Sequence, residues 1–336
     1  MTARAEPRLA QLEPVPAVAR IMERPGLAAV AGALTIAFSA ILVKLADVSP
    51  STAAIFRCAY AVPVLGALAL WEDRRFGART RRDRLLAAAA GVFFAGDLIF
   101  WHHAIEDVGA GLATVLGNLQ VVIIPFAAWA LLGERIGRRI LVALPLVCTG
   151  VVLISGALES GAYGEHPARG VLFGFLTGVT YAGFILVLRQ GSADLRRPAG
   201  PLFNATAVAA VTAVIAGLAI GELSLAPSWP AHGWLALLAL TSQVIGWLLI
   251  TVSLPRLPAA LTSVTLTIQP VASVALGVIL LGEAPSGLQI AGVGFILAGL
   301  ISVALRRPQP RAARTSAWTA SGSPVPSTRR SSPRSS

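Results

Sequence analysis

Residues 120–134, QVVIIPFAAWALLGE, and residues 269–283, QPVASVALGVILLGE, decide the fold. Both stretches begin with a glutamine, run through apolar residues and end in Leu-Leu-Gly-Glu, and they lie 149 residues apart. A single Leu-Leu-Gly-Glu would be weak evidence, because glycine and glutamate often end an apolar helix. Its recurrence in register with a mid-helix glutamine indicates an internal duplication.

Apolar residues surround both stretches in blocks of about twenty, the length that crosses a ~30 Å hydrocarbon core as a helix. Hydrophobic residues make up 55% of the 336 and charged residues 13%, about half the share typical of soluble domains. The sequence therefore predicts an all-α membrane protein with ten transmembrane helices. The predicted spans are 26–45, 52–71, 85–105, 109–132, 140–156, 170–189, 201–221, 233–253, 258–281 and 288–305.

The basic residues predict the orientation, because cytoplasmic loops retain Arg and Lys. With the N-terminus inside, 24 of the 27 basic residues fall in cytoplasmic segments, and Arg169 alone falls in an outer loop. Lys44 and Arg57 lie within predicted spans. We therefore expect both termini in the cytoplasm of a bacterial cell and the ten helices in its cytoplasmic membrane.

Five spans in each half is an odd number, so the second half must enter the membrane from the opposite side. The arginines agree, because Arg135, Arg138 and Arg139 follow the first Gly-Glu turn and none follows the second. Inverted repeats of this kind are frequent in secondary transporters, in which two similar halves expose a midplane site to each side in turn. Repeats can also be purely architectural.

The two halves, each with a Leu-Gly-Glu turn and then a helix that carries Gly150 or Gly299, resemble the EamA family of the drug/metabolite transporter superfamily. The resemblance covers most of residues 26–305. It implies ten helices as two inverted five-helix repeats around a central cavity. The expected parts are a cytoplasmic segment 1–25, repeats 26–156 and 170–305, an extracytoplasmic loop 157–169 and a disordered basic tail 306–336.

The resemblance also implies a function. We expect a secondary transporter, not an enzyme, that exports a small polar, amino-acid-like metabolite by alternating access. Its driving force is expected to be a coupling proton or an exchanged solute. The alternative is a non-transport membrane protein: a channel, a lipid-handling protein or a membrane-embedded acyltransferase-like enzyme. The enzyme alternative depends on His102 and Asp107, whose His-x-x-x-x-Asp spacing is a weak match to the motif of some acyltransferases.

Ionisable residues inside predicted spans are functional candidates, because a charge at a helix centre costs about 2.5 kcal/mol or more on insertion scales. Arg57 and Asp97 lie at roughly similar depths below the outer ends of their spans, so the two side chains can meet. The pair could bind a substrate carboxylate or amine, or Asp97 could carry a coupling proton. A purely structural ion pair is equally compatible with the sequence.

Neutral polar and aromatic residues add further candidates. Gln120 and Gln269 are related by the repeat and could line a cavity or bond neighbouring helices. Asn118 is expected on another face of its helix and is a weaker candidate. His102 could relay protons or pack at the interface. The further possible lining residues are Trp101, Tyr181 and Gln243.

Other features are interpreted as structural. Gly170, Gly174 and Gly178 form a ridge that lets another helix approach closely. Glu134 and Glu283 are interpreted as capping or turn residues with exposed carboxylates, and no substrate contact is expected for them. Cys58 and Cys148 show no disulfide or metal spacing, and no phosphate loop or hydrolase motif occurs, so we expect no cofactor, metal site or nucleic-acid partner. The sequence leaves open whether the protein is a monomer or a homodimer.

Overall fold

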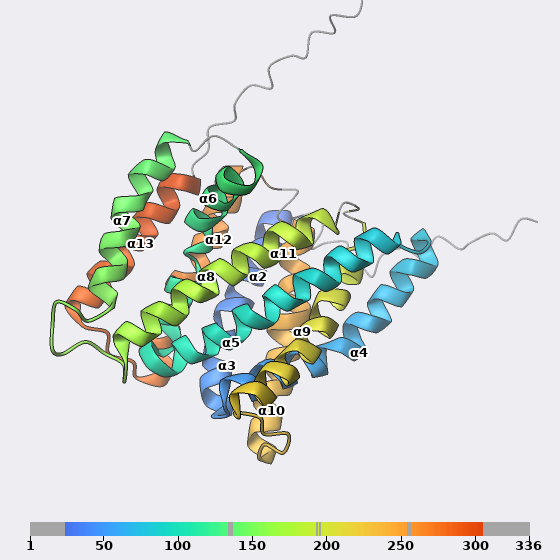
Figure 1. Ribbon diagram of the computed structural model, residues 1–336, viewed down its shortest axis with the longest axis horizontal. Helices are drawn as coiled ribbons and strands as arrows, with labels where there is room; N and C mark the ends of the chain where they lie inside the picture. Colours follow the sequence, from blue (N-terminus) through green and yellow to red (C-terminus); the bar gives the residue numbers. More distant parts are fainter. Residues whose placement is uncertain are drawn as a thin grey trace, which may run out of the picture. The chain divides into compact units, whose positions relative to one another are not determined.

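A computed structural model describes residues 24–133, 137–192, 194, 196–253, 257 and 259–304. This described part is built from helices and contains no strand (Figure 1). Its helices are α2 (Pro25–Ala37), α3 (Ser39–Ala46), α4 (Pro50–Phe76), α5 (Arg81–Gly117), α6 (Gln120–Leu132), α7 (Arg138–Ile154), α8 (Pro167–Gln190), α9 (Ala199–Ile220), α10 (Trp229–Leu238), the π-helix η1 (Ala239–Gly246), α11 (Trp247–Ser253), α12 (Ala259–Leu281) and α13 (Gly287–Ala304). The predicted tail 306–336, the first 23 residues and Glu134 lie outside the described residues.

Each predicted apolar segment is helical over most of its length, but three segments are interrupted. The first is divided at Phe38 into α2 and α3, and the eighth contains η1 between α10 and α11. The fourth is divided at Asn118 and Leu119, where α5 gives way to α6. The segments were predictable from apolar length, whereas the interruptions were not.

Helix α5 combines two antiparallel segments that meet at Gly109. Gly109 has φ 85° and ψ 167°, a backbone conformation that side-chain-bearing residues rarely adopt. The neighbouring helix α8 shows the reversal. Its Gly183 lies against Phe93 and its Gly170 against Val108, whereas Gly174 lies against Leu116. The contacts therefore run down the first segment and back along the second, which matches the predicted division between 85–105 and 109–132.

The glycine ridge of α8 packs as predicted. A Cβ atom at Gly170 would collide with the Val108 side chain, and one at Gly174 would collide with Leu116. At Gly178 the nearest atom is the Ile123 Cδ1, 3.0 Å from the added Cβ. The ridge therefore lets α8 lie against the segment that starts after Gly109.

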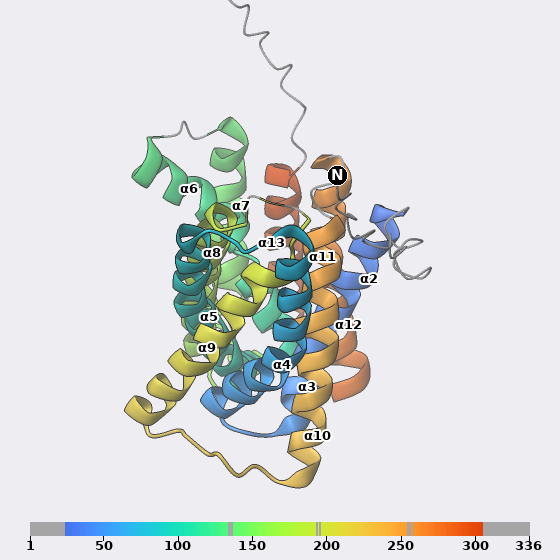
Figure 2. The same ribbon diagram turned by 90° about the vertical axis from the view of Figure 1, so that its right-hand side faces the viewer.

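Two helix pairs from different halves of the chain pack in antiparallel directions. In α7 and α13, Gly150 lies against Gly292, while Ala143 and Val147 lie against Gly299. In α4 and α9, the carboxylate of Glu72 near the end of α4 accepts hydrogen bonds at the start of α9. Figures 1 and 2 show both pairs side by side.

Six helices of the described part are long and apolar enough to cross a membrane: Pro25–Ala46, Pro50–Phe76, Arg81–Gly117, Pro167–Gln190, Ala199–Ile220 and Trp229–Ser253. The side chains of helix α9 are distributed as expected for a helix in a lipid bilayer. Its buried face carries alanines, while Val211, Ile215 and Leu218 on another face are each more than 60% exposed. Small residues inside and large apolar residues outside are typical of helices that contact lipid.

Candidate functional site

A central cavity of about 60 Å³ lies among the interrupted helices, a volume that admits a few water molecules. Its walls come from both halves of the chain. Ile36 and Ser39 flank the break at Phe38, and Asn118 lies at the end of α5. Irregular helical backbone is tolerated in an apolar bundle where it is buried or lines a wet cavity. The remaining lining residues are Arg57, Phe94, Asp97, Leu98, Trp101, Thr114, Gly117, Thr177, Tyr181, Trp247 and Gln269.

The guanidinium of Arg57 is buried and held in a fixed orientation from one side. Its Nε donates to the Gln243 Oε1 at 3.0 Å, and its Nη2 donates to the Ser242 Oγ at 3.3 Å. Both acceptors belong to η1, and π-helical turns are frequent at functional sites. Gln243 is itself held, because its Nε2 donates to the Thr206 Oγ1 at 3.1 Å.

One nitrogen of Arg57 is left over. Its Nη1 is buried and has no hydrogen-bond partner among the described residues. A buried donor without a partner costs about 1–3 kcal/mol, and more when it is charged. Because Arg57 lines the cavity, a ligand or water in the cavity can satisfy this donor.

Asp97 lines the same cavity and is 8% exposed. No ion pair within 4.0 Å joins the described side chains of Arg57 and Asp97, and the guanidinium bonds Gln243 and Ser242 instead. The predicted direct contact between Arg57 and Asp97 is therefore wrong for this structure. The cavity instead holds a guanidinium group and a carboxyl group that form no ion pair with each other.

Aromatic rings form the apolar part of the wall. The Arg57 Cζ lies 5.7 Å from the centroid of the Trp101 ring, within the range of a cation–π interaction. Trp247 stands edge-on to Phe94 and Tyr181, each with a centroid distance of 6.1 Å. The cavity thus combines a guanidinium and a carboxyl group with a wall of aromatic rings.

The predicted candidates divide into three groups. Arg57, Asp97, Trp101, Tyr181 and Gln269 line the cavity. Gln243 is fully buried behind Arg57 and supports it. The structure places Gln120 and His102 away from the lining.

The repeat-related glutamines therefore differ in position. Gln269 lines the cavity, whereas Gln120 starts α6 just after the break and does not. Asn118, the weaker sequence candidate, lines the cavity instead, and its Nδ2 donates to the Thr114 carbonyl at 2.8 Å. A turn at Asn118 and Leu119 separates α5 from α6, so Asn118 lies within this break and Gln120 lies after it.

His102 and Asp107, the possible enzyme pair, bind separate partners. The His102 Nδ1 lies 3.0 Å from the Pro50 carbonyl oxygen. Asp107 instead binds Arg169, whose Nε donates to both carboxylate oxygens at 3.0 and 2.9 Å. Nor can any group of three His, Cys, Asp or Glu side chains in the described ranges hold a metal ion.

Glu283 is a residue whose position sequence reasoning missed. The expected exposure of its carboxylate is wrong, because Glu283 is 3% exposed, whereas its hydrogen bonds agree with the expected capping role. Its Oε1 accepts a hydrogen bond from the Ala110 N–H at 2.5 Å, and its Oε2 accepts one from the Gly111 N–H at 3.1 Å. The sequence does contain Gly109 and Gly111, which permit close approach. The structure places both glycines against the second Leu-Gly-Glu turn.

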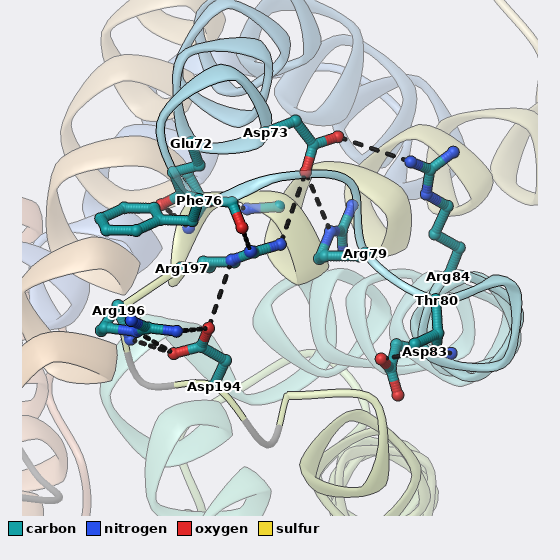
Figure 3. A network of polar contacts seen from close by, with 12 residues as sticks. Glu72, Asp73, Phe76, Arg79, Thr80, Asp83, Arg84, Asp194, Arg196 and Arg197 are labelled. Carbon is teal, nitrogen blue, oxygen red and sulfur yellow. Dashed lines mark hydrogen bonds and ion pairs between the residues drawn. The ribbon is translucent and has the colours of Figure 1, made fainter. Parts of the chain in front are cut away.

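The C-terminal end of α4, on the side of the bundle opposite Gly109, carries a network of polar residues that connects the two halves of the chain (Figure 3). Glu72 accepts hydrogen bonds from the N–H groups of Ala199 and Gly200 at 2.9 and 2.7 Å. Asp73 lies 3.6 Å from Arg84, and Arg197 donates to the Phe76 carbonyl. We call this side of the bundle the Arg79 end and the side with Gly109 the Gly109 end.

Two shifted pKa values show how this network is charged. Hydrogen bonds from Arg196 lower the pKa of Asp194 to about 2, so this carboxylate is ionised at all physiological pH values. Partial burial lowers the pKa of Arg79, while the neighbouring Asp73 raises it.

Comparison with known proteins identifies the architecture. The model of the EamA-like transporter family matches residues 25–156 and again residues 168–305. The chain belongs to the EamA-like transporter family. The double match shows two EamA repeats, so the predicted membership in the drug/metabolite transporter superfamily is confirmed. EamA proteins are generally transporters, and this one is a multi-pass membrane protein.

A solved structure, titled only "Crystal structure of protein", has the same fold. It aligns with a TM-score of 0.53 and 17% sequence identity over 84% of this EamA chain and 97% of its own. No curated relative matches the chain.

Proposed function

We propose that this EamA protein is a secondary transporter that moves a small polar, amino-acid-like metabolite out of the cell by alternating access. Ten spans would form two inverted five-helix halves in a bacterial cytoplasmic membrane, with both termini in the cytoplasm. The Arg79 end would then face the cytoplasm and the Gly109 end would face outward. The antiparallel pairs of α7 with α13 and α4 with α9 support this topology.

One observation carries the proposal: the central cavity contains an incompletely bonded guanidinium and a carboxyl group that forms no ion pair with it. The free Nη1 of Arg57 suits a carboxylate, because guanidinium groups bind carboxylates through charge-assisted hydrogen bonds. Asp97 suits an ammonium group or a proton. A zwitterion satisfies both, and the rings of Trp101 and Trp247 suit its side chain.

The cavity is small and is surrounded by interrupted helices, as in carriers that bind substrate near the membrane midplane. Breaks at Phe38 and at Asn118 and the π-helix η1 are places where segments of a helix can move separately. A carrier needs such mobile segments. A channel would need a continuous wet path through the bundle.

Counterflow in proteoliposomes tests this function. Vesicles containing purified protein are loaded with unlabelled amino acids and given labelled ones outside. We expect saturable exchange that competing zwitterions inhibit, and that decarboxylated amines inhibit much less. Unsaturable flux of the labelled solute would identify a pore and contradict the proposal. Absence of any flux across panels of amino acids, nucleosides and vitamins would contradict it as well.

A further inference from the structure

The side chain of Glu283 connects the two repeats. It follows α12, in the second repeat, and its carboxylate binds the first free N–H groups of the helical segment that begins after Gly109, in the first repeat. Helix starts attract carboxylates, because their N–H groups lack partners and carry partial positive charge. Each oxygen of Glu283 accepts one of these N–H groups.

The backbone directs Glu283 toward this contact. Gly282 has φ 68° and ends α12, and the Glu283 N–H donates to the Gly277 carbonyl at 3.1 Å. The chain therefore turns back at the end of α12, and the carboxylate points into the bundle. Glu283 is consequently 3% exposed although it lies at a turn.

Three glycines make room for the carboxylate. A Cβ at Gly109 would lie 2.6 Å from the Glu283 Oε1, and one at Gly111 would lie 3.2 Å from the Oε2. A Cβ at Gly277 would collide with the same Oε2. Close packing on three sides excludes water and fixes the carboxylate on its two donors.

The contact stands between the cavity and the Gly109 end. Thr114, which lines the cavity, lies one helical turn after Ala110, and its Oγ1 donates to the Ala110 carbonyl at 2.8 Å. Gln289 makes a second contact at this end. Its Oε1 accepts a hydrogen bond from the Tyr163 N–H, and its Nε2 donates one to the Tyr163 carbonyl, each at 2.9 Å. The loop that contains Tyr163 is thereby tied to α13 at this end.

We propose that Glu283 and the N–H groups of Ala110 and Gly111 form an outer latch, which holds the Gly109 end of the transport path shut. The latch must break before the cavity opens to the outside. Glu283 is thus a positioning residue of the transport cycle that does not contact substrate. The inference rests on the proposed alternating access, but its test measures conformation and needs no substrate.

The test uses a single reporter cysteine, Thr114→Cys, in a chain that also carries Cys58→Ala and Cys148→Ala. A membrane-impermeant thiol reagent is added to either side of vesicles of known orientation. Glu283→Gln keeps the shape of the side chain but places an NH₂ group against one of the two N–H donors. We expect labelling from the outside to rise tenfold or more, equivalent to about 1.4 kcal/mol, and labelling from the inside to fall.

Two comparisons make the test specific. Glu106→Gln removes another carboxylate at the same end, which lies 3.7 Å from the His103 Nδ1. This variant should leave both labelling rates unchanged. Gly277→Ala displaces the carboxylate while Glu283 remains, and should shift the rates as Glu283→Gln does. Gly294→Ala is its matched control, because a Cβ there meets nothing within 4 Å.

Outside labelling that stays unchanged in both Glu283→Gln and Gly277→Ala would overturn the latch. A rise from both sides together with lower thermal stability would also overturn it, because that result describes a loosened fold. If labelling shifts as expected while the wild-type protein exchanges no metabolite, the latch stands and the proposed transport function fails.

Discussion

At the scale of single residues, the cavity depends on how Arg57 is held. Gln243 and Ser242 bind two of its nitrogens, and the third, Nη1, has no hydrogen-bond partner among the described residues. An anion that entered the cavity could therefore bind Arg57 without first breaking an ion pair with Asp97. Substitutions can test the proposed roles of Arg57 and Asp97 separately.

Asp97→Asn tests the coupling role. If Asp97 carries the coupling proton, the variant should lose gradient-driven accumulation at least tenfold and keep passive exchange, because asparagine remains polar but does not titrate. Accumulation and counterflow in the same proteoliposomes measure the two activities. Loss of both activities with reduced expression would show that Asp97 is structural.

Thr206→Val tests the support behind Arg57. The Gln243 Nε2 donates to the Thr206 Oγ1 at 3.1 Å in the unsubstituted protein. Valine keeps the side-chain shape but removes this acceptor. We expect a loss of about 1–3 kcal/mol in stability and a several-fold higher KM for exchange, with little change in maximal rate.

Thr241→Val is the matched control, because the Thr241 hydroxyl is exposed and bonds the Leu237 carbonyl four residues earlier. Thermal unfolding and concentration-dependent counterflow measure both variants. Equal KM values for Thr206→Val and Thr241→Val would contradict the support role.

Which residues line the cavity could be predicted from the sequence in part, whereas the contacts between those residues could not. Burial costs identified Arg57 and Asp97 as candidates, and both line the cavity. Their pairing could not be predicted, because the competing acceptors Ser242 and Gln243 lie about 185 residues further along the chain and point inward from a π-helix. Glu283 was misplaced because a Gly-Glu turn has the same sequence whether its carboxylate faces solvent or a buried helix start.

At the scale of helices, close approach at glycines holds the halves together. A Cβ at Gly150 would lie 2.6 Å from the Gly292 carbonyl oxygen, and a Cβ at Gly292 would lie 2.7 Å from that of Gly150. The packing of α7 on α13 thus requires a small residue at both positions. The lengths of these helices were predictable from apolar runs, whereas the reversal at Gly109 has no distinct composition.

Gly150→Ala should weaken this pair. The added methyl group meets backbone atoms, which cannot rotate away, so we expect a destabilisation of about 1–3 kcal/mol. Gly294→Ala, on α13 itself, meets nothing within 4 Å and should be neutral or slightly stabilising. Thermal unfolding of the two purified variants makes the comparison, and equal unfolding temperatures would contradict the packing argument.

At the scale of the whole molecule, two polar clusters join the halves at opposite ends. Glu72 binds the start of α9 at the Arg79 end, and Glu283 binds the segment after Gly109 at the other end. Apolar composition predicted a membrane protein and the repeated Leu-Leu-Gly-Glu predicted two halves, because both are properties of the chain alone. Which cluster opens first depends on free-energy differences between conformations, which sequence patterns do not contain.

Opposite insertion of the two repeats is the central claim, and cysteine accessibility tests it most directly. Gly137→Cys and Gly287→Cys are introduced separately into the chain with Cys58→Ala and Cys148→Ala; a Cβ at either glycine meets nothing within 4 Å. An impermeant maleimide is then added to right-side-out and inverted membrane vesicles. We predict that Gly137→Cys reacts only from the cytoplasmic side and Gly287→Cys only from the outside. Labelling of both from the same side would contradict the account.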